Sequence, residues 1–201
     1  MSILGRILDR AGRFRLERRW RVLRAKGMRI GRHVNLPMST WIDVAHCHLI
    51  SIGDRCGFGE ECLILAHDAM MNEYLDATRI ARVVVHDSCH IGGRTVILPG
   101  VEIGPRSIVG SNSVVTKSIP PDSVAAGNPA RVLCTLGEYL DRHRRRMAEV
   151  PCFPYEQFDV RSLTPEGRAE MLRLLDRREG YVTGGYTALL EGRCGLQVTG
   201  D

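Results

Sequence analysis

The sequence lacks an apolar run of the roughly 18 residues that a membrane-spanning helix needs, and its beginning lacks the apolar stretch of a secretory signal. Seven cysteines are present without a CxxC pair or a regular spacing, which argues against a disulfide scaffold and for reduced thiols. A composition of 44% hydrophobic and 25% charged residues is ordinary for one globular domain with appendages. We therefore expect a cytoplasmic protein, and the 21 glycines are the excess to follow.

Basic residues crowd the first 28 positions, although the net charge of the chain is +5. The basic residues of this segment are Arg6, Arg10, Arg13, Arg15, Arg18, Arg19, Arg21, Arg24 and Lys26. Its apolar residues form two helical stripes, one from Leu4 to Phe14 and one through Leu16, Trp20 and Leu23. This pattern favours a helix that docks on its neighbour with a solvated arginine face, and peripheral contact with acidic lipids is the alternative. Nucleic acid is not expected as a partner, because no aromatic platform is interleaved with the charges.

A period of six residues organises the middle of the chain. Every sixth residue is a branched aliphatic at Val85, Ile91, Ile97, Ile103, Val109 and Val115. Small residues follow four places later, at Cys89, Thr95, Val101, Ser107 and Ser113. The same pattern runs upstream through Ile52, Phe58 and Ile64, with Cys56 and Cys62 in the small place, and more weakly through Ile30, Leu36 and Ile42. Three of the seven cysteines are therefore interpreted as core residues.

A six-residue period fits neither a helix nor a flat strand, but it fits a short strand followed by a tight corner. Three such faces close a triangular rung of about 18 residues, and stacked rungs fill the prism with aliphatic ladders. Glycine after the aliphatic position, as at Gly92 and Gly104, supplies the corner conformation. Pro120 and Pro121 should end the ladder because they lack N–H donors. The period predicts a mainly β fold but does not give its handedness.

The region from Val85 onward includes the segment HIGGRTVILPGVEIGPRSIVGSNSVVTKSIPPDSVAAGNPARVL. This segment resembles the hexapeptide-repeat acetyltransferases, and among them the sugar and polysaccharide O-acetyltransferases such as the galactoside and maltose enzymes. The resemblance implies a left-handed parallel β-helix with N-terminal and C-terminal helices, assembled as a homotrimer that uses acetyl-CoA and no metal. The implied domains are a basic helical segment at 1–28, the β-helix at 29–133 with a loop at 67–84, and a C-terminal helical extension and tail at 134–201.

The period breaks between Ile64 and Val85, where LAHDAMMNEYLDATRIARV contains no aliphatic ladder. We expect a loop there that carries binding groups on a rigid base. Acyl transfer from a thioester needs a base for the attacking hydroxyl, and histidine, with an unperturbed pKa of about 6.5, suits that role. The family's catalytic histidine precedes this loop, and L-A-H-D resembles its T-H-D form, so the resemblance implies His67 as the general base. Asp68 is interpreted mainly as a turn residue, because strand neighbours point apart.

The resemblance also implies which residues hold acetyl-CoA in a cleft between two subunits. The backbone N–H of Gly93 would stabilise the charge that develops on the thioester oxygen. Ser111, Thr116 and Lys117 match positions that contact the pantetheine arm, and Arg131, which follows the GNPA segment, matches a basic residue near the nucleotide phosphates.

The expected acceptor is a sugar, a cell-surface saccharide or its precursor. Candidate substrate-binding residues are Asn35, Asp43, Asp68 and His90. His90 occupies a position where related enzymes often carry an aromatic residue. Two roles are open for it: a contact with the acceptor, or an alternative general base. The step from Ile42 to Ile52 is four residues too long for a clean hexad.

Three other functions stay open at this stage. An N-acetyltransferase of an amino-sugar nucleotide would need the same base and thioester. A γ-class carbonic anhydrase would hold zinc with three histidines, and His67, His86 and His90 invite that comparison although their spacing differs. A non-catalytic scaffold would not bind acetyl-CoA. The segment His46-Cys47-His48 is interpreted as a strand with exposed imidazoles over a core thiol, because alternation separates three such side chains.

After Val132 the hexads stop, and LGEYLDRHRRRMAEV is typical of a charged helix. Thr164-Pro165 predicts a helix with an N-cap and a proline in its first turn, ending at Gly180. The glycine-rich tail from Gly184 onward is expected to be mobile. This region contains no recognisable chemistry.

Overall fold

The computed structural model describes residues 3–159 and 162–186, with side chains from residue 14 onward. The described residues up to Gly137 form one compact unit, and those from Glu138 onward form a second. All site residues that the sequence predicts lie in the first unit.

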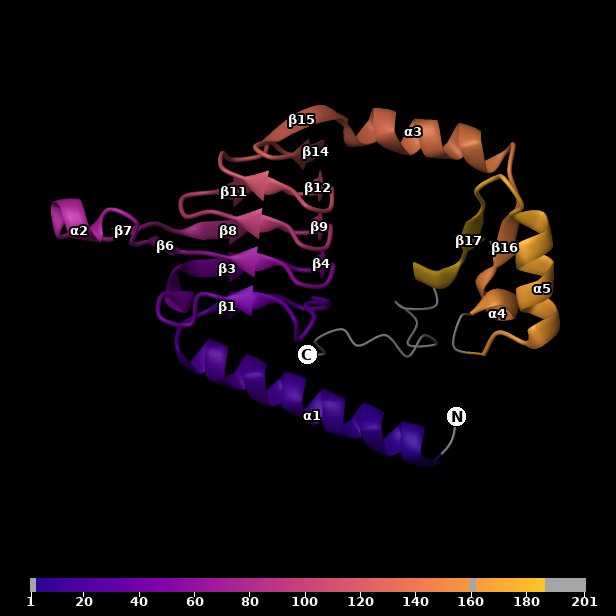
Figure 1. The fold of residues 1–201 in the computed structure, drawn as a ribbon, viewed down its shortest axis with the longest axis horizontal. Helices are drawn as coiled ribbons and strands as arrows, with labels where there is room; N and C mark the ends of the chain where they lie inside the picture. The colour runs from indigo at the N-terminus through magenta and orange to yellow at the C-terminus, as the bar shows by residue number, and fades with distance from the viewer. Residues whose placement is uncertain (1–2, 160–161, 187–201) are drawn as a thin grey trace. The chain divides into compact units, whose positions relative to one another are not determined.

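The first unit is a coil of short parallel strands stacked in three sheets, named here faces 1, 2 and 3 (Figure 1). Face 1 contains β1 (Arg29–Ile30), β3 (Ile50–Ile52), β8 (Val83–Val85) and β11 (Glu102–Ile103). Face 2 contains β4 (Gly57–Phe58), β9 (His90–Ile91), β12 (Ile108–Val109), β14 (Ser123–Gly127) and β15 (Ala130–Thr135). Face 3 contains β2 (Trp41–Ile42), β5 (Leu63–Ile64), β10 (Val96–Ile97) and β13 (Val114–Val115).

The chain visits faces 1, 2 and 3 in turn and then repeats, so that three hexads make one rung. Val85 accordingly pairs with Ile103, eighteen residues later. Within the three faces the strand pairs are parallel except for β14 with β15, which doubles back along the edge of face 2.

The inward residues of the hexads fill the prism, as the period predicts. The six aliphatics from Val85 to Val115 are at most 2% exposed, and Cys56, Cys62 and Cys89 are equally buried, which confirms these cysteines as core residues. The buried hydroxyl of Ser107 donates to the carbonyl oxygen of Pro120 at 2.9 Å, so the small polar residues of the ladder remain hydrogen bonded. Each fully buried aliphatic side chain contributes about 1.5–3 kcal/mol, so the ladders stabilise the coil along its length.

Helix α1 (Ile3–Ala25) packs on the first rung through one of its two predicted stripes. Trp20 and Leu23 are 4% and 2% exposed, and Leu16 packs beside them. The guanidinium of Arg19 donates to the carbonyl oxygens of Met38 and Thr40. Docking of this stripe is thus confirmed, whereas Leu4, Ile7, Leu8 and Ala11 of the other stripe lie outside the described side chains. Within the part of the chain that the structure describes, helices are too short or too polar to cross a membrane.

The coil continues past Pro120 and Pro121, contrary to the prediction, because β14 still pairs with β12 on face 2. Prolines are tolerated at this corner for a conformational reason. Pro105 and Pro121 each precede a residue with left-handed backbone, Arg106 at φ 56° and Asp122 at φ 52°. Such a turn takes a fixed negative φ at its preceding position, which proline supplies. The missing N–H of Pro121 therefore interrupts no ladder bond, and Pro120 directly follows Ile119, the last described residue of face 1 that pairs with a neighbouring rung.

Between β5 and β8 the chain leaves the coil as an arm, seen projecting from the strands in Figure 1. Strand β6 (His67–Asp68) pairs antiparallel with β7 (Arg79–Ile80), and α2 (Asn72–Leu75) lies between them. The predicted loop is thus a short hairpin with one helical turn.

The second unit contains β16 (Cys152–Pro154), α4 (Tyr155–Phe158), α5 (Pro165–Leu174) and β17 (Tyr181–Thr183). Helix α3 (Leu136–Met147), which the sequence predicts, crosses the boundary between the units. The hydroxyl oxygen of Thr164 accepts the N–H of Gly167 at 3.1 Å, which confirms the predicted cap of α5.

Helix α5 ends at Leu174, not at Gly180 as predicted. Arg177 adopts a left-handed φ of 58°, which breaks the helical path. Gly180 then packs closely against Phe153, so that β17 can pair with β16 in a two-stranded parallel sheet that the sequence pattern does not reveal. Residues 187–201, which make up most of the predicted mobile tail, lie outside the described residues.

Candidate active site

Both long insertions of the coil lie at one corner, where the chain passes from face 3 to face 1. The first insertion, residues 43–49, follows β2, and the second, the arm, follows β5. Because β2 and β5 are paired neighbours on face 3, the two insertions begin side by side. This 3–1 corner therefore combines side chains from two separate breaks of the period.

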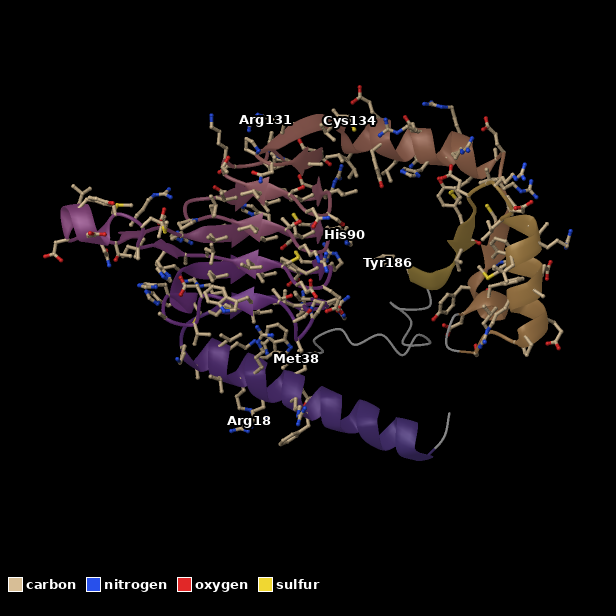
Figure 2. The ribbon with its side chains drawn as sticks, in the orientation of Figure 1. Arg18, Met38, His90, Arg131, Cys134 and Tyr186 are labelled. Atoms are coloured by element: carbon tan, nitrogen blue, oxygen red, sulfur yellow. The ribbon has the colours of Figure 1, made fainter. Side chains whose placement is uncertain are left out.

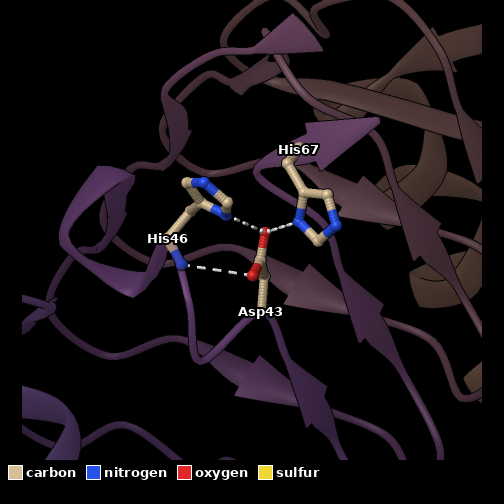
Figure 3. Close-up of side chains that lie close together, drawn as sticks. All are labelled: Asp43, His46 and His67. Carbon is tan, nitrogen blue, oxygen red and sulfur yellow. Dashed lines mark hydrogen bonds and ion pairs between the residues drawn. The ribbon is translucent and has the colours of Figure 1, made fainter. Parts of the chain in front are cut away.

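Asp43, at the start of the first insertion, faces His67, at the start of the arm (Figure 3). The Asp43 side chain is 1% exposed, and its Oδ2 lies 2.5 Å from His67 Nδ1. Its Oδ1 accepts the N–H of His46 and its Oδ2 accepts the N–H of Ala66, both at 3.2 Å. Both carboxylate oxygens are thus engaged inside the protein. Asp43 was predicted as a substrate-binding residue, and this geometry favours positioning of His67 over direct contact with an acceptor.

Hydrogen bonds keep the Asp43 carboxyl group ionised. Burial alone would raise its pKa, but the hydrogen bonds from His67 and from the N–H groups of His46 and Ala66 lower the pKa below its ordinary value. An ionised Asp43 places the proton of His67 on Nδ1, which leaves the lone pair on Nε2. Figure 3 shows Nε2 directed away from Asp43. Since the His67 side chain is 31% exposed, Nε2 is available to a substrate hydroxyl.

His46 is a second imidazole at the same carboxylate. Its Nδ1 lies 3.5 Å from Asp43 Oδ2, and its ring centroid lies 4.8 Å from that of His67. The predicted strand at His46-Cys47-His48 is wrong, because Cys47–Leu49 form the 3₁₀ turn η1. The insertion has no neighbouring strand to pair with, so its backbone bonds locally, from Leu49 N–H to the His46 carbonyl. Cys47 is buried and His48 exposed as expected, but His46 turns toward Asp43.

Gly93 and Ser111 lie at a different corner, where the chain passes from face 2 to face 3. The rungs approach closely at this 2–3 corner, since a Cβ on Gly92 would lie only 2.4 Å from the backbone nitrogen of Ser111. Among the described residues, the N–H groups of Gly93 and Ser111 have no acceptor. They are therefore free to donate to a ligand carbonyl.

A groove of about 450 Å³ runs along face 2 beside this corner. Its walls include Asn35 and His90, two of the predicted substrate-binding residues, and it extends to Ser111. Four glycines leave backbone exposed along it: Gly57, Gly59, Gly92 and Gly110. Partial burial lowers the pKa of His90 below its ordinary value, so this imidazole, labelled in Figure 2, is neutral at neutral pH.

The other predicted coenzyme residues are exposed. Thr116 and Lys117 follow β13 at the 3–1 corner, and Arg131 lies on β15. Asp68 Oδ1 accepts the N–H of Met70 at 3.0 Å, which confirms its interpretation as a turn residue.

The three histidines of the carbonic anhydrase alternative are dispersed around the coil. His67 is at the 3–1 corner and His90 on face 2, while His86 follows face 1 and lies 2.5 Å from Glu102 Oε1. A single chain does not gather them around one metal ion.

The structure thus gathers the predicted residues into two groups at opposite edges of face 3. His67, Thr116 and Lys117 share the 3–1 corner, whereas Gly93 and Ser111 share the 2–3 corner. Sequence reasoning missed the contact of Asp43 with His67 and the approach of His46. The available signal was the overlong step from Ile42 to Ile52, which marks a second insertion at the same corner.

Comparison with known proteins adds the family. Residues 82–117 match the bacterial transferase hexapeptide (six repeats). This part of the chain is thus similar to the hexapeptide-repeat transferases. The match and the three-faced coil confirm the predicted fold class, a left-handed parallel β-helix with helices at both ends.

Two relatives of this hexapeptide-repeat protein illustrate the extent of the similarity. YvoF of Bacillus subtilis (strain 168), named only provisionally as an acetyltransferase, is 32% identical over 118 residues, which cover 59% of this chain and 66% of YvoF. Galactoside O-acetyltransferase of Escherichia coli (strain K12) is 44% identical over 61 residues, 30% of each chain. This chain therefore spans less than two thirds of either relative.

Among solved structures, the chain is similar to the hexapeptide-repeat acetyltransferase VCA0836 of Vibrio cholerae O1 biovar eltor, determined with acetyl coenzyme A. It is 26% identical, the match covers 60% of this chain and 77% of that one, and the TM-score is 0.48.

Proposed function

We propose that this hexapeptide-repeat protein is an acetyl-CoA-dependent O-acetyltransferase of a sugar or cell-surface saccharide, with His67 as the general base. The observation that carries the proposal is the buried, ionised Asp43 bonded to His67 Nδ1, which leaves Nε2 as a proton acceptor. The similarity to galactoside O-acetyltransferase supports both the reaction class and a sugar acceptor.

In this reaction, His67 Nε2 accepts the proton of an acceptor hydroxyl while the hydroxyl oxygen attacks the thioester carbonyl carbon. The imidazolium that forms is stabilised by Asp43, 2.5 Å from Nδ1. The developing charge on the thioester oxygen is stabilised by a backbone donor, for which the free N–H of Gly93 is the candidate. When the carbon–sulfur bond breaks, His67 returns the proton to the leaving thiolate.

This chemistry needs both corners, and a homotrimer supplies them together. The outward side of face 3 is an apolar ladder formed by Trp41, Leu63, Val96 and Val114. Trp41 and Leu63 are 48% and 37% exposed in the single chain. Three copies that turn face 3 toward a common axis bury this ladder, and the 3–1 corner of each copy then meets the 2–3 corner of the next. His67 of one copy comes beside the neighbouring copy's Gly93.

Face 3 is a better candidate for this contact than face 1. The outward side of face 1 includes Arg29, Ser51 and Glu102, whose polar groups favour water over an interface core.

In the cleft between copies, acetyl-CoA meets donors from both corners. The N–H groups of Gly93 and Ser111 are available to the thioester and pantetheine carbonyl oxygens. The exposed charges of Lys117 and Arg131 suit the nucleotide phosphates. The groove with Asn35 and His90 lies beside the 2–3 corner and offers polar contacts to the pantetheine group of acetyl-CoA or to the acceptor.

The proposal is tested by incubating the purified protein with acetyl-CoA and a panel of sugars and oligosaccharides, while release of free coenzyme A thiol and product mass are followed. The expected result is coenzyme A release that depends on a sugar and a product heavier by one acetyl group on oxygen. Acetylation of amino-sugar nucleotides alone would replace the O-acetyl proposal with N-acetylation. Failure to bind acetyl-CoA by calorimetry would contradict the proposal and favour a scaffold.

A further inference from the structure

Asp43, His46 and His67 form a compact set of metal-ligating atoms that the transfer reaction does not require as a set (Figure 3). One ligand atom from each residue lies within 4.8 Å of the other two. Asp43 Oδ2 is 2.5 Å from His67 Nδ1 and 3.5 Å from His46 Nδ1. The three donors therefore surround one small volume.

His46 supplies the observation that separates this set from a simple hydrogen-bonded pair. Its Nδ1 is buried and, among the described residues, has no hydrogen-bond partner. It nevertheless faces the oxygen that His67 already contacts. A buried ring nitrogen without a partner is costly, and a bound cation at this point would satisfy it.

The donor set indicates the class of ion. Two imidazole nitrogens and one carboxylate oxygen suit zinc and its neighbours among the transition metals, whereas magnesium and calcium prefer sets made of oxygen atoms. Three protein ligands leave a fourth position for water, as in open zinc sites.

The distances are close to those of a tetrahedral site. With metal–ligand bonds of about 2.0–2.2 Å, ligand atoms lie roughly 3.3 Å apart. The present separations of 2.5 and 3.5 Å from Asp43 Oδ2 lie on either side of that value, and the ligand atoms of His46 and His67 lie within 4.8 Å of each other, so rotation of the two rings is needed to bring all three pairs to it. All three residues belong to insertions rather than to the rigid ladder, which allows such rotations.

We propose that Asp43, His46 and His67 form a binding site for a zinc-class divalent ion that inhibits the protein. The ion bonds to His67 Nδ1, and the single ring proton moves from Nδ1 to Nε2, so that one nitrogen–metal bond forms, one N–H bond breaks, another forms and no net proton is released. With its proton on Nε2, the neutral imidazole can no longer accept a proton from a hydroxyl. Metal binding itself stands apart from the proposed acetyl transfer, whereas the inhibition rests on it.

The binding test uses the full chain after treatment with a chelator, with cobalt(II) as a spectroscopic probe and zinc as a competitor. We expect one cobalt ion per chain, visible absorption bands of a low-coordinate site, displacement by zinc and no displacement by magnesium. His46→Ala should weaken cobalt binding more than about tenfold, since even loss of a supporting residue costs that much. His48→Ala is the matched control, because this neighbouring imidazole is exposed and does not face Asp43, and it should bind as the original chain does.

The inhibition test compares each protein with its own metal-free rate. Zinc should suppress coenzyme A release by the original chain and by His48→Ala, and a chelator should restore it, while His46→Ala should respond only at more than about tenfold higher zinc. Equal cobalt binding by His46→Ala and the original chain would overturn the site. Cobalt binding without any transferase activity would support the metal site and contradict the proposed function. Transferase activity without cobalt binding would contradict the metal site and support the proposed function.

Discussion

The 2–3 corner and the 3–1 corner of the coil are built from the same hexads, yet they differ in what they offer a ligand. The 2–3 corner keeps the six-residue period in the steps from β4 to β5, from β9 to β10 and from β12 to β13. It presents glycines, a serine and free N–H groups such as those of Gly93 and Ser111. The 3–1 corner carries two insertions, residues 43–49 and the arm, and presents a carboxylate and two imidazoles.

The difference teaches how a repeat protein acquires chemistry. In the strict hexads, the 2–3 corner beside the groove is lined by glycines and Ser111, so it offers a ligand mainly backbone groups. Insertions are free of the ladder, and two of them on adjacent rungs bring Asp43 against His67 although 24 positions separate them in sequence. Under the proposed function, one corner supplies electrostatic donors and the other supplies acid–base groups, and each can be disabled separately.

Replacing His67 by alanine disables the 3–1 corner and should have the largest effect. Loss of a general base lowers turnover by roughly 10²–10⁴-fold. Coenzyme A release in the presence of an acceptor sugar measures this, with His48→Ala as the control. Retention of most of the activity would remove His67 from the role of base.

Replacing Gly93 by proline disables the 2–3 corner by deleting one N–H. The fold should tolerate it, because Pro105 already occupies the equivalent turn position before a left-handed residue, as Gly93 does before Arg94 at φ 60°. Loss of one such donor costs roughly 10²–10³-fold in turnover. Gly93→Ala is the control, since it keeps the N–H; its Cβ would lie 3.1 Å from the Glu60 carbonyl oxygen, a tight contact that a shift of a few tenths of an ångström relieves. Equal activity of the proline and alanine variants would show that the Gly93 N–H does not stabilise the thioester oxygen during transfer.

Replacing Asp43 by asparagine tests how the 3–1 corner holds its base. A charge-assisted hydrogen bond is worth about 1.5–3 kcal/mol, so turnover should fall by roughly 10–100-fold while the Michaelis constant for acetyl-CoA changes little. Asp68→Asn is the control, because Asp68 lies next to His67 on the arm and its carboxylate accepts the Met70 N–H. A similar loss in both variants would mean that the arm, not the His67 contact, is responsible.

Mixing the two disabled chains tests whether the corners meet between copies. In a closed threefold ring, randomly mixed His67→Ala and Gly93→Pro chains place an intact 3–1 corner against an intact 2–3 corner at about a quarter of the interfaces. Activity of the co-expressed mixture should therefore recover to about a quarter of the original. If mass spectrometry shows mixed oligomers but activity does not recover, the two corners do not meet between copies. Each working site would then use both corners of a single chain, or the two corners would not act together.

The smallest effect concerns stability against acid. The pKa of Asp43 is lower in the folded state, so the unfolded chain binds more protons below about pH 3.9, and the stabilisation is complete above that value. Relative to Asp43→Asn, the original chain should gain about 1–3 kcal/mol above this pH and lose that advantage as the pH falls through the folded pKa. Urea unfolding at a series of pH values measures the difference, and an advantage that grows on acidification would contradict the sign.

The fold and the backbone geometry of the 2–3 corner were predictable because their residues repeat. The aliphatic residues from Val85 to Val115 recur at a fixed interval, which predicts that they are buried. Thr164 predicts a helix start because its hydroxyl can cap the first turn. The pairing of Asp43 with His67 was not predictable from spacing, since it depends on two insertions meeting across adjacent rungs. The end of α5 at Leu174 was not predicted for a similar reason. The residues of β17, which follow α5, pair with the distant strand β16, and no local sequence pattern predicts that pairing.

The pairing of Val85 with Ile103 also limits how the length of this chain can change. Adding or deleting one hexad inside the regular coil shifts every later residue to the next face, which would carry Ser111 away from Gly92. Only whole rungs preserve the alignment of the corners. The coil can therefore change in length only by multiples of eighteen residues. The arm after β5 can gain or lose any number of residues.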